Sequence, residues 1–104
     1  MARLAPTVVY VTYEGTPNSR FDQRYYVERH LPLVMQAWQR YGLDDVAAFF
    51  TPSARAGTLA ICECRFRDDA AAAAAFGSPE STAVMADLAN FTDIAPARLR
   101  VTPL

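Results

Sequence analysis

The chain alternates between two kinds of hydrophobic pattern, and each kind predicts a different element. Short segments rich in β-branched and aromatic residues, bounded by Gly, Pro, Asn or Asp, are typical of strands. The first such segment is apolar at both odd and even positions, so we expect it to be buried on both faces. The pattern predicts four strands, at residues 7–13, 45–51, 58–66 and 97–103.

Two longer segments repeat their apolar residues every three or four positions, which is the period of a helix. In the first, Asp22 is placed to cap the start and Gly42 to end the helix. Pro32 cannot donate a backbone hydrogen bond, so we expect a kink or short break near His30. The apolar face of this helix consists of Tyr26, His30, Leu33, Val34, Ala37 and Tyr41.

The second helical segment runs from Asp68 to about Ala89 and contains a run of alanines, the best helix formers. Asp68 is a favourable N-cap for it. The residues of the "GSPE" sequence at 77–80 are typical of the start of a helix, so we expect one helix to end and a second to begin there.

The predicted order of elements is β-α-β-β-α-β, in a single domain over residues 1–104. This order predicts an α+β, ferredoxin-like fold, with an antiparallel sheet and both helices on one face. The first strand is apolar at positions of both parities, so the face without helices is also apolar. Such a face is too large to leave in water. We therefore predict a homodimer in which two sheets pack face to face.

Composition narrows the classes of function. Hydrophobic residues make up 52% and charged residues 20%, which is typical of a globular domain. The net charge is −1, and the basic residues are scattered arginines, which argues against a nucleic-acid partner. No apolar run approaches the roughly 18 residues that a membrane span requires, and no signal peptide is recognisable. The expected location is cytoplasmic.

Cys62 and Cys64 are two residues apart in a predicted strand, so their side chains point to the same face. That geometry does not suit a disulfide between them. Together with one distant histidine they also fall short of a four-ligand zinc site. We expect buried, reduced thiols, and we predict neither a metal nor a cofactor.

Two segments carry a resemblance to a known family: "FDQRYYVERHLPLV" at 21–34 and "GSPESTAVMADLANFTDIAP" at 77–96. They resemble the EthD-type family, named for ethyl tert-butyl ether degradation, within the dimeric α+β barrel superfamily. In that pattern a Phe and an acidic residue precede two aromatics, then a His, then Pro-Leu. The resemblance covers nearly the whole chain in the right order.

The resemblance implies a dimeric α+β barrel with a pocket beside the sheet for a small, often aromatic or cyclic molecule. The family's founding member is encoded with an ether-oxidising oxygenase system. Related barrels include polyketide cyclases, cofactor-free quinone-forming monooxygenases and lactone isomerases. A role in catabolism or in polyketide-type secondary metabolism is the corresponding expectation.

His30, the single histidine of the chain, is the candidate acid/base. Tyr26 precedes it by one helical turn, so the two side chains share a face, and the tyrosine can donate a hydrogen bond to a carbonyl or enolate oxygen. The pair would suit proton abstraction beside a carbonyl, or an aldol-type ring closure, without a cofactor. Candidates for an apolar, substrate-binding wall are Tyr13, Trp38, Phe66 and Phe91.

A structural interpretation of the same residues stays open. His30 would then bond a backbone group freed by Pro32, with its other nitrogen tied to Asp93 or Glu63. For Glu63, a carboxylate in an apolar strand, an ion pair with Arg98 or Arg100 is expected. The protein as a whole would be a non-catalytic binding or accessory protein supporting a partner oxygenase.

Overall fold

The computed structural model describes residues 6–52 and 55–102. Its centre is a four-stranded antiparallel sheet with the strand order β2-β3-β1-β4. This order confirms the predicted α+β, ferredoxin-like fold. The strands are β1 (Thr7–Gly15), β2 (Leu43–Phe50), β3 (Gly57–Phe66) and β4 (Ala97–Val101).

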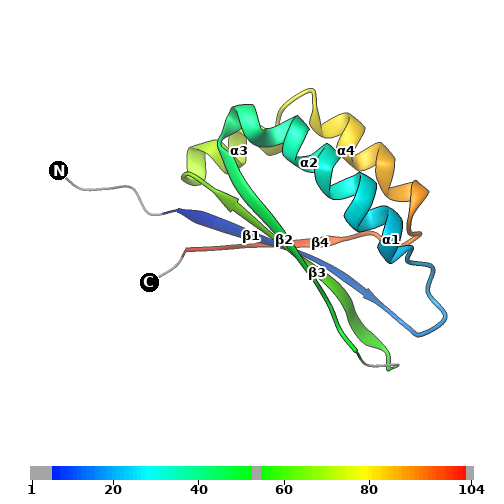
Figure 1. Cartoon of the computed structure of the whole chain (residues 1–104). Helices are drawn as coiled ribbons and strands as arrows, with labels where there is room; N and C mark the ends of the chain where they lie inside the picture. Colours follow the sequence, from blue (N-terminus) through cyan, green and yellow to red (C-terminus); the bar gives the residue numbers. More distant parts are fainter. Residues whose placement is uncertain (1–5, 53–54, 103–104) are drawn as a thin grey trace.

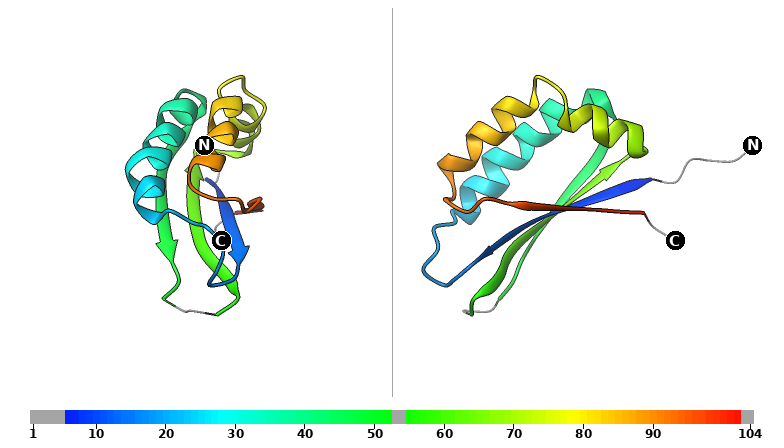
Figure 2. Two further views of the ribbon diagram at one scale, coloured as in Figure 1. Left: turned by 90° about the vertical axis from the view of Figure 1, so that its right-hand side faces the viewer. Right: turned by 180° about the vertical axis from the view of Figure 1, so that it is seen from behind.

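Two helical arms lie side by side on one face of the sheet, and none of the described residues forms a helix on the other face (Figures 1 and 2). The first arm connects β1 to β2, and the second connects β3 to β4. The first arm consists of α1 (Gln23–Tyr25), η1 (Tyr26–His30), α2 (Leu31–Trp38) and η2 (Gln39–Tyr41). The second consists of α3 (Asp69–Phe76), α4 (Ser81–Asp87) and η3 (Leu88–Asn90).

The predicted helix caps are confirmed. The Asp22 side chain accepts a hydrogen bond from the Tyr25 N–H at 3.0 Å, and Asp68 accepts one from the Ala71 N–H at 2.8 Å. Gly42 ends the first arm with a φ of 109°, a left-handed conformation that residues with a Cβ rarely adopt. The break at "GSPE" separates α3 from α4.

The interruption expected near His30 takes the form of a π turn. In η1 the Leu31 N–H bonds the Tyr26 carbonyl, five residues earlier. Pro32 at the start of α2 has no N–H to offer the Glu28 carbonyl, and its ring would crowd that carbonyl in a regular α-helix. The wider turn relieves this conflict and places His30 at its end, a feature that recurs at functional sites.

The register separates the two faces of the sheet. Val9 lies opposite Cys64 and Val11 opposite Cys62, and these four side chains lie on the face under the helices. The intervening Tyr10 therefore lies on the uncovered face. That face also carries large exposed apolar side chains, with Phe49 of β2 52% exposed and Leu99 of β4 60% exposed.

The observed strands depart from the expected ranges only at their ends. β1 continues to Gly15, β2 begins at Leu43 and β4 ends at Val101. The expected end of the last strand at residue 103, and residues 53 and 54 of the turn after β2, lie outside the described residues. None of the helices in the described ranges is long and apolar enough to cross a membrane.

Candidate functional site

A cavity of about 310 Å³ lies between the helical arms and the covered face of the sheet. A volume of this size is at the lower end for pockets that hold small ligands. Four of the six candidate catalytic and substrate-binding residues line it: Tyr13, Tyr26, His30 and Trp38. Most of the remaining lining is apolar, including Val11, Leu31, Val34, Val84 and Leu88.

Phe66 and Phe91 are fully buried but are not part of the cavity lining. Phe91 packs directly on the imidazole of His30, with 4.6 Å between ring centroids. Phe66 packs against Trp38 at 6.3 Å and against Phe76 at 5.5 Å. Both phenylalanines therefore support side chains of the wall from behind.

His30 is buried and held on two sides. Its ring stacks on that of Tyr26, with 5.5 Å between centroids and 20° between planes, as their shared helix face predicts. Its Nδ1 lies 2.9 Å from Oδ2 of Asp87, at the end of α4. Asp87 is not among the partners expected for His30 from the sequence.

Asp87 is the centre of a small polar network. Its Oδ1 accepts hydrogen bonds from the Tyr25 hydroxyl at 2.7 Å and from the Asn90 side-chain amide at 2.9 Å. Burial opposes ionisation of this carboxyl, but the hydrogen bonds from Tyr25, Asn90 and His30 outweigh it and hold the pKa of Asp87 below its ordinary value. Asp87 is therefore a carboxylate at neutral pH.

Burial lowers the pKa of His30, and the Asp87 carboxylate only partly offsets this effect. His30 is therefore neutral at pH 7. A carboxylate can only accept hydrogen bonds, so the proton of the neutral imidazole resides on Nδ1, facing Asp87. Nε2 is left as an acceptor, and it makes no hydrogen bond within the described residues.

The Tyr26 hydroxyl is in a setting that keeps it protonated. Burial is the main reason that the pKa of Tyr26 is raised, and neighbouring Cys62 and Tyr13 raise it further. Because its pKa is raised, Tyr26 remains a hydrogen-bond donor at neutral pH. Cys62 and Cys64 are buried free thiols, as predicted, with 3.7 Å between their sulfurs, and both line the cavity.

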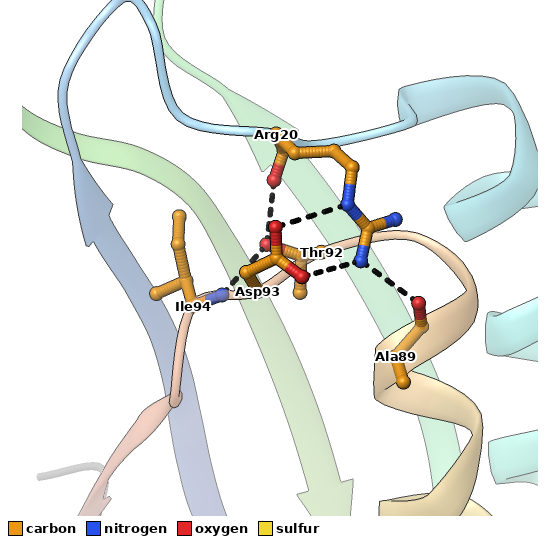
Figure 3. A network of polar contacts seen from close by, with 5 residues as sticks. All are labelled: Arg20, Ala89, Thr92, Asp93 and Ile94. Carbon is orange, nitrogen blue, oxygen red and sulfur yellow. Dashed lines mark hydrogen bonds and ion pairs between the residues drawn. The ribbon is translucent and has the colours of Figure 1, made fainter.

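The partners expected for His30 from the sequence are wrong. Asp93 instead binds Arg20, whose Nη2 donates to Asp93 Oδ1 at 2.8 Å and to the Ala89 carbonyl at 2.8 Å (Figure 3). The Thr92 hydroxyl donates to the Arg20 carbonyl at 2.7 Å, which joins the same two segments again (Figure 3). The contacts of the Arg20 side chain are exposed and Thr92 is buried, and together they tie the loop after β1 to the loop before β4.

The ion pair expected between Glu63 and Arg98 or Arg100 is also wrong. Glu63 lies opposite Tyr10 on the uncovered face and accepts a hydrogen bond from its hydroxyl at 3.1 Å. Arg98 and Arg100 lie opposite Val11 and Val9, on the covered face. The pleat of the strands therefore separates the expected partners.

A signal for Asp87 does exist in the sequence. It follows Val84 by three residues and precedes Phe91 by four, so helical spacing places it on the same face as two buried apolar side chains. A lone carboxylate on a buried face needs a partner, and the single histidine is a natural one. Within the described residues, no three His, Cys, Asp or Glu side chains gather as metal ligands would.

Comparisons with known proteins agree with this architecture. An EthD-like protein from Ralstonia eutropha JMP134 superposes with a TM-score of 0.83 at 25% identity, covering 94% of this chain and 91% of that one. An ethyl tert-butyl ether degradation (EthD) family protein from Bacillus halodurans C-125 gives 0.71 at 19% identity, over 95% and 99%. A dimeric protein of unknown function and ferredoxin-like fold from Bacteroides fragilis NCTC 9343 gives 0.57 at 9% identity, over 98% and 100%.

A search of curated proteins gave no match. The EthD domain, by contrast, matches residues 18–95, three quarters of the chain, and this range includes both helical arms and the His30–Asp87 pair. The chain belongs to the EthD family.

Proposed function

We propose that the protein binds a small apolar or aromatic metabolite in the cavity and that His30 acts on it as an acid/base without a cofactor. The observation that carries this proposal is a neutral, buried histidine on the wall of an apolar cavity, oriented by a carboxylate. That arrangement leaves one basic nitrogen for a ligand and fixes the direction of the ring.

The chemistry this supports is removal of a proton from a carbon next to a carbonyl. Nε2 of His30 takes the proton, and the electron pair of the broken C–H bond moves onto the carbonyl oxygen as an enolate. Asp87 stabilises the imidazolium that forms, and the Tyr26 hydroxyl donates to the enolate oxygen. Return of the proton from His30 to another carbon completes an isomerisation. In a ring closure, the enolate carbon attacks a second carbonyl of the same molecule, the electron pair of that C=O bond moves onto its oxygen, and the resulting alkoxide takes the proton from His30.

Tyr13 and Trp38 supply the apolar wall, with Phe66 and Phe91 packed behind it. The wall keeps water from the enolate and strengthens the electrostatic interactions within the site. The Trp38 indole N–H is already bonded to the Ser81 hydroxyl at 3.0 Å, so its ring presents apolar surface in a fixed orientation. Catabolism or polyketide-type secondary metabolism is the setting in which such chemistry is needed.

The alternative is a binding or accessory protein that performs no chemistry and supports a partner oxygenase. One observation favours it: Asp87 also holds Tyr25, so the network joins the two helical arms and has a structural use without turnover. Under this alternative, the cavity binds a ligand and His30 only completes the packing.

Exchange of protons with solvent separates the two functions without knowledge of the natural substrate. A panel of small aromatic ketones is incubated with the protein in D₂O, and deuterium at the carbon next to the carbonyl is measured by mass spectrometry. We expect catalysed exchange that His30→Gln abolishes while NMR signals of the folded protein persist. Ligand-induced shifts of the protein's NMR signals without any exchange would instead establish the binding function.

We also propose that the uncovered sheet face packs on a second copy of the chain. Exposed Phe49 and Leu99 on that face support a partner, and the Bacteroides fragilis structure of this fold is described as dimeric. We expect light scattering to give twice the 11.5 kDa mass of one chain. Leu99→Glu should yield monomers, whereas Val27→Glu, at a similarly exposed apolar position in the helical layer, should not.

A further inference from the structure

Arg98 brings a full positive charge to a cavity wall that is otherwise uncharged among the described lining residues. It lies on β4 opposite Val11, so the pleat directs it to the covered face of the sheet. Its guanidinium carbon is 4.2 Å from the centroid of the Phe76 ring, a cation–π contact. This contact orients the planar guanidinium at the cavity without using its hydrogen bonds.

No carboxylate of the described residues lies within ion-pair distance of Arg98. Arg100, two residues further along the same strand face, differs because it lies 3.9 Å from Asp69. Among the described residues, therefore, no carboxylate neutralises the charge of Arg98. An arginine fork without a counter-ion beside an apolar cavity favours an anionic ligand, and a carboxylate matches its geometry best.

The charge and the base lie in different parts of the cavity. The Arg98 head is on Phe76, whose ring packs 5.1 Å from that of Trp38 at the end of α2. His30 precedes α2 and packs with Tyr26 and Phe91. The eight residues from His30 to Trp38 correspond to about 12 Å along a helix at about 1.5 Å per residue.

We propose that the ligands of the cavity are small aromatic or cyclic carboxylic acids, with the carboxylate on Arg98 and the reactive carbon at His30. This assignment rests on the proposed function, because it names the substrate class for the same cavity. Arg98 is exposed, so a carboxylate bound to it keeps part of its hydration and the cost of desolvating the anion is limited. The rest of the molecule lies against the apolar wall.

Matched acid–amide pairs test the assignment. 4-Acetylbenzoate and 4-acetylbenzamide have nearly the same shape and carry a ketone opposite the varied group, and a two-ring pair extends the series. Dissociation constants are measured by calorimetry on the wild-type protein, Arg98→Gln, Arg98→Lys and Arg100→Gln. Urea unfolding of each variant verifies that the fold is kept.

For the wild type we expect the acid to bind up to about fivefold more tightly than the amide, because Arg98 is exposed and a partly hydrated ion pair contributes less than a buried one. Arg98→Gln should remove the preference and leave amide binding unchanged, and Arg98→Lys should keep part of it. Arg100→Gln, the control on the same strand face, should retain the full preference.

The outcomes distinguish the two proposals. Equal binding of acid and amide by the wild type, or an undiminished preference in Arg98→Gln, overturns the role of Arg98 and leaves the pocket intact. Absence of binding by every acid and amide, with no shift of the His30 imidazole signals in NMR spectra, overturns the pocket and the assignment built on it.

Discussion

Two acid–base pairs join nearly the same two segments of the chain and differ in their surroundings. The Arg20–Asp93 and His30–Asp87 pairs have almost equal lengths, 2.8 Å and 2.9 Å. The side chains of the first are 44% and 78% exposed, whereas those of the second are 4% and 12% exposed. The distance between the charged atoms alone therefore does not show how much each pair contributes to the stability of the fold.

The two pairs differ in energy because one is exposed to water and the other is buried. An exposed pair replaces good hydration with a screened attraction, and its contribution is typically about 0.2–1 kcal/mol. A buried pair contributes little net energy relative to an apolar replacement, but removing one partner leaves the other without hydration. The buried pair is thus the more costly one to disturb, and of the two pairs it is the one with a side chain, that of His30, on the cavity wall.

The largest effect is expected for Asp87→Ala. His30 is buried and would lose its acceptor, whereas water can replace the acceptor of the half-buried Tyr25. An unsatisfied buried donor costs about 1–3 kcal/mol, so we expect a loss of that size in the free energy of unfolding. Urea denaturation measures it. The matched control, Asp93→Ala, should cost no more than about 1 kcal/mol. Equal losses for the two variants would contradict the comparison.

A smaller effect is expected from pH. The pKa of His30 is lowered in the folded protein, so the unfolded chain binds more protons below its ordinary value of about 6.5. The free energy of unfolding should therefore be highest above that pH. It should decrease below it, by up to about 1.4 kcal/mol per pH unit. Urea midpoints at pH 7.5 and 5.5 measure the fall. His30→Gln should remove most of it, since this is the only histidine.

The smallest effect is expected for Arg20→Ala. Although Arg20 bonds both Asp93 and the Ala89 carbonyl, all of these contacts are exposed, so the loss should be within about 1 kcal/mol. It should also shrink in high salt, which screens the surface pair. A loss well above this, insensitive to salt, would show that the two loops depend on the arginine for their packing.

The sequence predicted correctly those features that depend on the residues of a single helix or strand. The shared face of Tyr26 and His30, the caps at Asp22 and Gly42, and the succession of strands and helices along the chain all follow from local spacing. The partner of His30 depends on how the second arm is placed against the first. The sequence predicted Asp93 or Glu63 as this partner and not Asp87, because spacing along one helix does not show which residue of the other arm lies beside it.

The π turn shows the same limit within one element. Pro32 predicts that the helix is interrupted, because a proline removes one hydrogen bond and crowds one carbonyl. Whether the chain then kinks, breaks or widens depends on the packing of neighbouring residues. Here the stack of His30 on Tyr26 and Phe91 favours the wider turn.

The sheet of this protein is a single layer with a different task on each side. In β1, Val11 borders the cavity, whereas its neighbour Tyr10 lies on the uncovered face. Substitutions at alternate positions can therefore be selected separately, one set by the shape of the cavity and the other by the surroundings of the uncovered face. The insertion or deletion of one residue within the strand would exchange the two sets, so evolution is free to change the side chains here but not the length.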